Sequence, residues 1–180
     1  MVIIMPFTPF HIGPSAWLAL YLREKINPLV FILSNVFIDI ESLLIGLYWP
    51  WQWAHGYCHN FLIGSLVGFA VGIICYLGKG IFERLNRLLH LQYRISFKKM
   101  LFSAILGVWF HILLDALVDP NIHPFFPIKV NPFFGFIPLF VVKWLCALCF
   151  IPAVLMFMKN YNKNRPVQEN NGKDYNKYKL

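Results

Sequence analysis

The stretch LFSAILGVWFHILLDALVD, residues 101–119, decides the fold predicted for this chain. Most of its side chains are apolar, and at about 1.5 Å per residue a helix of this length reaches across the ~30 Å hydrocarbon core of a bilayer. Its second half nevertheless carries the ionisable side chains His111, Asp115 and Asp119. The stretch therefore predicts a helix that spans a membrane and holds polar groups toward one of its ends.

Three more apolar stretches of similar length flank this one, at 28–48, 60–78 and 136–158, and a shorter one lies at 10–22. The whole chain is 58% hydrophobic and only 13% charged, which lies far outside the range of soluble globular proteins. We therefore expect an all-α fold, a multi-pass transmembrane helical bundle with about four spanning helices and one short N-terminal helix. The short stretch could tilt in from the surface or pack against the others as a half-helix.

Positive charge is concentrated in two segments, 79–99 and 159–180, each with six Lys or Arg. The positive-inside rule predicts that both face the cytoplasm. Binding of anionic lipid or nucleic acid is the alternative reading of such segments, and topology alone explains them, so no nucleic-acid partner is expected. Residues 1–158 are thus expected to form the membrane-embedded domain, and 159–180 a disordered basic cytoplasmic tail with little to bury.

This orientation places the connections 49–59 and 120–135 on the outer side, where their aromatic side chains suit a membrane interface. It also gathers most of the ionisable side chains of the apolar region near the same face. His90 alone among the histidines lies in the basic segment. The other five histidines, and the acids that accompany them, are His11, His55, His59, His111, His123, Asp39, Glu41, Asp115 and Asp119.

His111 and Asp115 are four residues apart and share one face of a helix, and His55 and His59 would do so if their segment were helical. Neutral imidazole nitrogens and carboxylate oxygens are the ligand types of hydrolytic zinc sites. The spacing therefore indicates a site for a divalent metal. The alternative is a set of buried polar side chains that pair with one another and stabilise the bundle.

The cost of insertion favours the metal site. Thirteen Leu, Ile, Phe and Val residues of 28–48 contribute about −4 to −8 kcal/mol in all, whereas Asp39 and Glu41 cost roughly 2.5 to 3.5 kcal/mol each. The net free energy of inserting this segment into a membrane by itself is therefore close to zero. Acids kept inside a membrane at such a cost indicate a functional site.

Four motifs carry a resemblance to a known family. They are Thr-Pro-Phe-His-Ile-Gly (8–13), Ile-Asp-Ile-Glu (38–41), His-Gly-Tyr-Cys-His-Asn (55–60) and His-Ile-Leu-Leu-Asp-Ala-Leu (111–117), the last followed by Pro-Phe-Phe-Pro (124–127). In this order they resemble the bacterial inner-membrane metal-dependent hydrolases, often called LexA-binding, inner membrane-associated hydrolases. That family is in turn similar, in the order of its ligands, to zinc-dependent phospholipase C and the zinc-dependent single-strand nucleases.

The resemblance implies a ligand set of His11, Asp39, one of His55 and His59, His111, Asp115 and His123. The soluble enzymes add a later His-x-x-x-Glu or His-x-x-x-Asp, and this chain has no histidine after position 123. One or two zinc ions, or another divalent metal, are therefore expected rather than three. The resemblance also implies a location in the bacterial cytoplasmic membrane.

These observations lead to the hypothesis of a metal-dependent hydrolase at the outer face of that membrane. Its substrate would be a small-molecule or lipid-linked phosphoester reached among membrane lipids, with Asp39 or Glu41 taking a proton from water. A metal or proton transporter using the same residues is the alternative, although the inner halves of 60–78 and 136–158 carry no ionisable side chain for a conduction path. A metal-stabilised scaffold without turnover is a third possibility.

Overall fold

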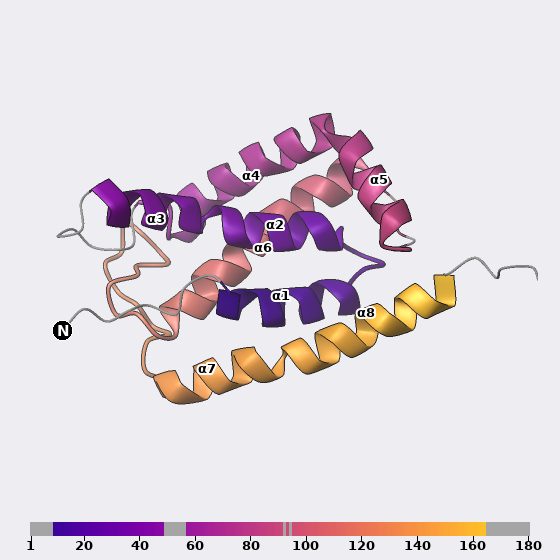
Figure 1. The fold of residues 1–180 in the computed structure, drawn as a ribbon. Helices are drawn as coiled ribbons and strands as arrows, with labels where there is room; N and C mark the ends of the chain where they lie inside the picture. The colour runs from indigo at the N-terminus through magenta and orange to yellow at the C-terminus, as the bar shows by residue number, and fades with distance from the viewer. Residues whose placement is uncertain (1–8, 49–56, 92, 94, 165–180) are drawn as a thin grey trace, which may run out of the picture.

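The computed structural model describes residues 9–48, 57–91, 93 and 95–164 of the chain. Within these ranges the chain is helical and contains no β-strand, which confirms the predicted fold class. In chain order the helices are α1 (Pro9–Tyr21), α2 (Pro28–Phe37), α3 (Asp39–Tyr48), α4 (Phe61–Leu77), α5 (Lys79–Leu88), α6 (Phe97–Ala116), α7 (Leu139–Leu148) and α8 (Phe150–Asn164), as Figure 1 shows.

Three continuous stretches of the described chain are long and apolar enough to cross a membrane. They are Pro28–Ile45, which joins α2 to α3, Phe97–Ala116, which is α6, and Leu139–Asn164, which joins α7 to α8. Helices α4 and α5 together make a fourth, but α5 is bent away from α4 by 74°. The spans predicted from apolar stretches are thus present as helices in the expected order.

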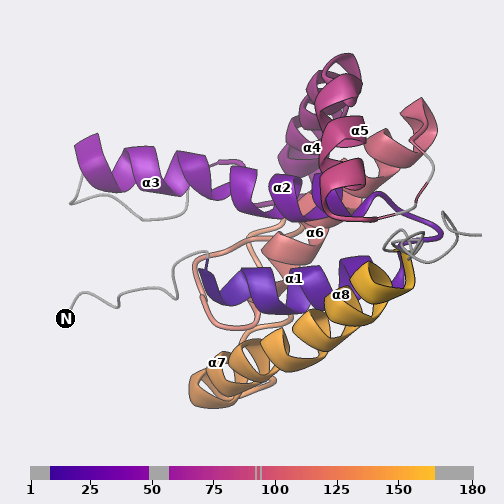
Figure 2. The same cartoon turned by 45° about the vertical axis from the view of Figure 1, so that its right-hand side comes forward.

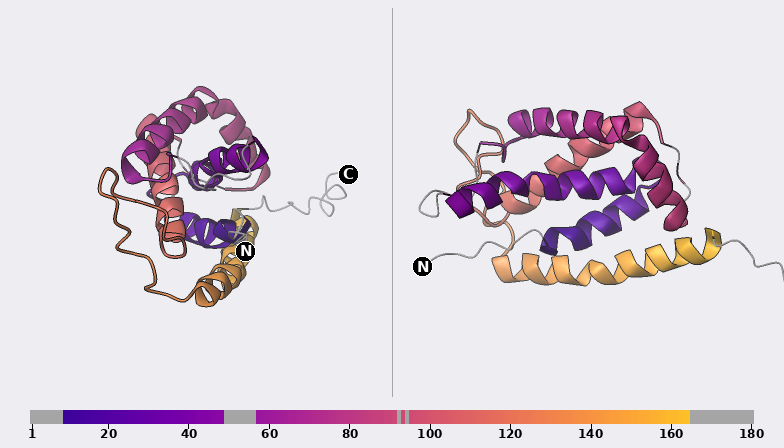
Figure 3. Two further views of the ribbon diagram at one scale, coloured as in Figure 1. Left: turned by 90° about the vertical axis from the view of Figure 1, so that its left-hand side faces the viewer. Right: turned by 45° about the horizontal axis from the view of Figure 1, so that its top comes forward.

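The structure departs from the predicted boundaries at the basic end of the bundle. Part of the segment 79–99, expected to connect two spans, forms α5, which turns away at the end of α4 (Figure 3). Helix α8 continues past the expected end at 158, because buried Asn160 accepts a hydrogen bond from Arg23 and Asn164 donates one to the His90 carbonyl at 2.8 Å. The remainder of the predicted tail, 165–180, lies outside the described residues.

Helix α6 lies at the centre of the bundle because its two neighbours approach it very closely. Gly64, Gly68 and Gly72 of α4 recur every four residues, and a Cβ on Gly68 would lie 2.8 Å from the Ile105 Cα of α6. On another side of α6, a Cβ on Gly107 would lie 2.3 Å from the Phe31 carbonyl oxygen of α2. Small residues at such positions let helix backbones approach and pack in a membrane. They fix how α6 meets α2 and α4 along its length.

The short helix α1 packs against α2 on one side and against α7 and α8 on another (Figure 2). With 13 residues it is about 20 Å long, too short to span a bilayer alone. Of the two arrangements considered for this segment, the structure shows the packed one. A Cβ on Gly13 would meet the Cys146 carbonyl oxygen at 2.6 Å, so this contact also depends on glycine. His11, near the start of α1, is thereby brought into the bundle.

The close approach of α2 and α6 makes a testable prediction. Gly107→Val should lower the stability of the detergent-solubilised protein by about 1–3 kcal/mol, because added atoms meet a backbone carbonyl and the Ser34 hydroxyl oxygen, the latter 2.2 Å from the first of them. Thermal unfolding measures the change. Gly80→Ala in α5 is the control, since a Cβ there meets nothing within 4 Å. An unchanged unfolding temperature for Gly107→Val would contradict the packing described.

Candidate metal centre

Helix α6 supplies two deeply buried members of the polar cluster. His111 and Asp115 lie one turn apart on its second half and are 0% and 3% exposed. The His111 Nε2 atom is 2.9 Å from Asp115 Oδ2, as the four-residue spacing predicts. Val108 and Ile112 on the same helix are fully buried and pack with Ile38 and Ala116 around this turn, so the polar pair lies against an apolar layer.

Asp39 enters the cluster from the start of α3. A single turn residue, Ile38, separates α2 from α3, and its side chain is buried against α6. This anchors the next residue, so that Asp39 Oδ1 lies 3.0 Å from His111 Nε2. The Asp39 side chain is 18% exposed, which makes it the most accessible of the clustered groups.

His59 enters from the turn that precedes α4. Asn60 caps that helix, with its side-chain oxygen accepting from the Ile63 amide at 2.9 Å and its amide donating to the Tyr57 carbonyl at 2.6 Å. The cap fixes the backbone on either side of His59, whose ring is turned inward and 3% exposed. His59 Nε2 then lies 3.7 Å from Asp39 Oδ1. It lies 3.8 Å from Asp115 Oδ2.

One donor atom from each of Asp39, His59, His111 and Asp115 lies within 4.8 Å of the other three. The four separations given above range from 2.9 to 3.8 Å. Ligands at 2.0–2.1 Å from a tetrahedral zinc ion are about 3.4 Å apart, so these atoms already stand near the spacing that such an ion requires. Two neutral imidazoles and two carboxylates would carry two negative charges in an apolar bundle, and a divalent cation balances them. The donor set therefore fits zinc.

His11 joins the cluster from the far side of Asp115. Its Nε2 is 3.3 Å from Asp115 Oδ1, the oxygen that does not face His59 and His111. Its ring meets the His111 ring edge to face, with centroids 4.6 Å apart. His11 is therefore placed to hold the Asp115 carboxylate, or to bind a second ion that shares this carboxylate.

Glu41 lies behind His59 and not among the four donor atoms. Its Oε2 accepts a hydrogen bond from the Cys58 backbone amide at 2.9 Å and lies 3.7 Å from His59 Nδ1. A carboxylate on the second ring nitrogen of a ligating histidine fixes the ring and its tautomer. The geometry thus suits Glu41 to position His59, while Asp39 is the acid that lies in the cluster.

The structure does not place the two remaining histidines of the expected ligand set, His55 and His123, at the centre. His55 lies outside the described residues, so the structure gives a place only to its partner in the alternative, His59. His123 is part-exposed in the loop after α6, where its Nδ1 lies 2.7 Å from the Asn121 carbonyl oxygen. It is not among the described side chains gathered at the centre.

Two supporting residues were not anticipated from the sequence. Asn60 precedes an apolar run, which is a recognisable helix-start signal. Asn131, far along the loop, donates to the carbonyls of Ala116 and Asp119 at 2.9 Å each and so closes the end of α6 beside the cluster. The sequence offers no signal for that second role, because it depends on how the loop folds back.

Binding of zinc should weaken as the pH falls from 8 to 6. Burial lowers the pKa of His59, but the carboxylates of Asp39 and Glu41, each 3.7 Å from one of its ring nitrogens, outweigh burial and raise this pKa above 6.5 in the metal-free protein. A ligating imidazole must lose its proton, so below the raised pKa each pH unit should cost about tenfold in apparent affinity per proton released. Competition with a calibrated chelator at pH 6, 7 and 8 measures this. Affinity that stays constant over the range would show that the metal displaces no proton from His59.

No protein-family model, no curated protein and no solved structure matches this chain. The resemblance carried by the four motifs therefore remains an expectation. The centre itself brings together two imidazoles and two carboxylates from α3, α6 and the turn before α4.

Proposed function

We propose that this chain is a membrane-embedded, metal-dependent hydrolase that uses zinc to cleave a phosphoester in a small-molecule or lipid-linked substrate. The observation that carries the proposal is the convergence of four donor atoms within 4.8 Å, inside a bundle of apolar helices. Holding the buried carboxylate of Asp115 beside the part-exposed one of Asp39 in such a bundle is costly without a cation, and intramembrane acids generally mark function. The reaction class draws on the family resemblance of the motifs.

The composition of the donor set supports a catalytic centre over a structural one. Structural zinc sites are mostly rich in cysteine and closed, whereas catalytic sites use histidine and carboxylate and leave a position for water. With His59, His111 and Asp115 as its three ligands, an ion here would keep its fourth position for water, and Asp39, the part-exposed member, would stand beside that water on the accessible side of the centre, the side of α3. When bound, zinc lowers the pKa of a coordinated water from 15.7 to about 7 and polarises the phosphoryl oxygen.

The side chains around the centre would act as a base, as positioning groups and as an apolar wall. Asp39, on the accessible side, is placed to accept a proton from the attacking water. Glu41 holds the His59 ring through Nδ1, and His11 holds Asp115 through Oδ1. Val108, Ile112 and Ile38 close the apolar side, which keeps bulk water from the centre and strengthens its electrostatic interactions.

The transporter alternative is less well supported by the described core. A transported ion needs polar steps through the whole bundle. Toward the basic end the buried polar side chains are uncharged: Asn27, Ser34, Asn35, Asn86, Ser103 and Asn160. The buried histidines and acids of the described core, His11, His59, His111, Asp115 and Asp119, all lie at the other end.

Hydrolysis should be sensitive to chelators and should depend on the clustered residues. We expect the purified protein in bilayers or micelles to cleave a lipid-linked phosphoester, with His111→Ala abolishing turnover and Asp39→Asn reducing it at least 100-fold, about the effect of losing a positioned base. Glu41→Gln should chiefly weaken zinc binding, by about 10–100-fold. Turnover assayed with and without added zinc separates the two effects.

Lys98→Ala, an exposed position at the opposite end, serves as the control and should leave both turnover and zinc content unchanged. Zinc-dependent flux across proteoliposomes, with no turnover of any phosphoester tested, would overturn the hydrolase and favour the transporter. Equal zinc content in His111→Ala, Asp115→Ala and the wild type would remove the metal centre itself.

The outer placement of the centre is part of the proposal and has its own test. Cys58 is a poor reporter, because burial and the nearby Glu41 raise the pKa of its thiol to about 11. Tyr57, 83% exposed, is better suited. In a Cys58→Ser background, Tyr57→Cys should react with an impermeant maleimide on intact cells, and Lys98→Cys only after permeabilisation. The reverse pattern would place the centre at the cytoplasmic face.

A further inference from the structure

The end of the bundle opposite the metal centre carries a large surplus of positive charge. Helix α5, the start of α6, the end of α8 and the α1–α2 connection meet there (Figure 3). The described acids of this end are Glu24 and Glu83. Its described basic residues are Arg23, Lys25, Lys79, Arg84, Arg87, Lys98, Lys99, Lys159 and Lys163. A partner of this surface should therefore be an anion.

Helix α5 has the geometry of a helix that lies in a membrane interface. It follows the apolar helix α4 with a bend of 74°, so that when α4 crosses the bilayer, α5 runs nearly in its plane. Phe82 and Asn86 face the bundle and are buried. Ile81, Leu85 and Leu88, one helical turn apart, form a stripe that is exposed by 63%, 37% and 72%. Such a stripe beside basic side chains suits the boundary between acyl chains and headgroups.

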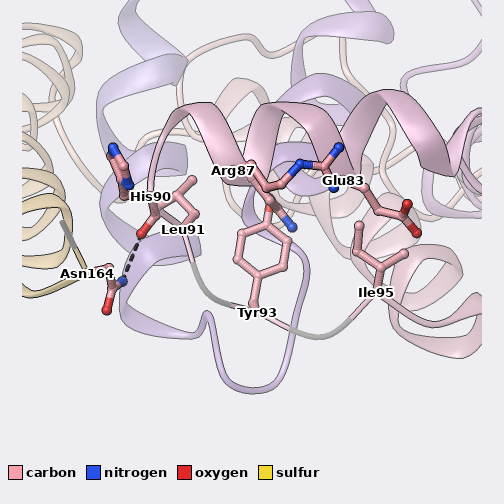
Figure 4. Close-up of a pocket in the computed structure, with 8 residues that line it drawn as sticks. Glu83, Arg87, His90, Leu91, Tyr93, Ile95 and Asn164 are labelled. Carbon is pink, nitrogen blue, oxygen red and sulfur yellow. Dashed lines mark hydrogen bonds between the residues drawn. The ribbon is translucent and has the colours of Figure 1, made fainter. Parts of the chain in front are cut away.

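An open pocket of about 440 Å³ lies beside α5, between this helix and the end of α8 (Figure 4). Among the described residues, its wall includes Arg87 and His90, with Glu83 as an acid. The chain reverses at His90, whose φ of 50° and the bond from the Leu91 amide to the Asn86 carbonyl at 2.9 Å close α5. The Asn164 amide donates to the His90 carbonyl at 2.8 Å, which joins this wall to α8. The pocket is therefore built by tertiary contacts.

A smaller pocket of about 150 Å³ adjoins the first and shares Leu91, Tyr93 and Asn164 with it. Arg23 and Lys163 line it, opposed by Glu24. Asn160, 5% exposed, also lines it. Its side-chain oxygen accepts from Arg23, while its amide nitrogen has no hydrogen-bond partner among the described residues. Two cations, one acid that pairs with Arg23 at 3.5 Å, and an unsatisfied donor thus surround one small space, which keeps a net positive charge.

We propose that these adjoining pockets bind the headgroup of an anionic phospholipid, with α5 lying in the interface and its apolar stripe against the acyl chains. Arg87 on one side and Arg23 with Lys163 on the other can each donate to a phosphate oxygen, and the Asn160 amide gains an acceptor. The site is distinct from the metal centre, and the proposal does not depend on hydrolase activity. The lipid would act as a structural ligand that holds α5 against α8.

The exposed apolar stripe favours a lipid over other anions. A nucleic acid or free phosphate would use the basic side chains but would leave Ile81, Leu85 and Leu88 in water. A lipid occupies both features at once, because its headgroup and acyl chains meet at the depth where α4 ends and α5 begins. Each basic side chain near an anionic membrane surface adds about fivefold to affinity.

Titration of the full chain in neutral detergent tests the proposal. The probes are short-chain phosphatidylglycerol, phosphatidylcholine of the same chain length, and inorganic phosphate, with the unfolding temperature as readout. We expect phosphatidylglycerol to stabilise the wild type most. Arg87→Gln and Lys163→Gln should each weaken its apparent affinity about fivefold, and Leu88→Ser should weaken both lipids alike. Lys129→Gln, an exposed change near the other end, should have no effect.

Two further outcomes would overturn the proposal. Equal stabilisation by inorganic phosphate would show a site for a free anion, and equal stabilisation by phosphatidylcholine would show only apolar association. Hydrogen exchange in nanodiscs gives a second measure that does not depend on unfolding. Amides of 79–91 should be better protected in phosphatidylglycerol than in phosphatidylcholine, and identical protection of wild type and Arg87→Gln would likewise contradict the site.

Discussion

The arrangement of this bundle depends on one buried carboxylate, that of Asp115, in contact range of three imidazoles. Its Oδ1 faces His11, and its Oδ2 faces His59 and His111. An isolated carboxylate in an apolar interior is too costly to keep, so partners for it must be in place when the bundle forms. Since they come from α1, from the turn before α4 and from α6 itself, the requirement fixes three parts of the chain at once. Helix α3 is fixed in the same way, because Asp39 at its start lies next to His111.

Such convergence is possible only where helices approach more closely than ordinary side chains allow. Gly107 lies one turn before His111 and lets α2 meet α6, which carries Asp39 toward the cluster at the start of α3. Gly64 lies just after His59, and a Cβ there would lie 2.7 Å from the Ile112 Cδ1 atom. Packing and chemistry are therefore linked, because the glycines that let the helices pack also set the distances between donor atoms. The chain gives up conformational stability at these glycines, and close helix packing offsets that loss.

The sequence was sufficient to predict the features that repeat along one helix. Apolar length identified the spans, and the four-residue spacing of His111 and Asp115 predicted a shared face that the structure shows.

Features that depend on how the chain turns back on itself could not be predicted from the sequence. Glu41 lies near Asp39 in sequence, yet the turn at Cys58 places it behind His59 rather than beside Asp39 in the cluster. His123 fits the expected order of ligands, but in the structure its Nδ1 atom contacts the Asn121 carbonyl oxygen within the same loop and not the clustered donor atoms. The pattern of Ile81, Leu85 and Leu88 could have indicated α5, because its spacing is helical.

For the proposed hydrolase, the depth of the candidate metal centre bears on the kind of substrate that it can reach. His111 lies five residues before the end of α6 at Ala116, about 8 Å below that end along the helix axis. A centre at the membrane midplane would be closed to any polar group, and one at the surface would need no apolar bundle to hold it. If the centre acts as proposed, the phosphate of a lipid-linked substrate would have to descend only slightly from the headgroup layer to this intermediate depth, while its acyl part stayed in the bilayer. The part-exposed carboxylate of Asp39 lies on the side from which such a phosphate would arrive, whereas His111 and Asp115 close the opposite side. Binding energy from the acyl chains could then offset the dehydration of the phosphate, which a free soluble phosphoester has no means to do.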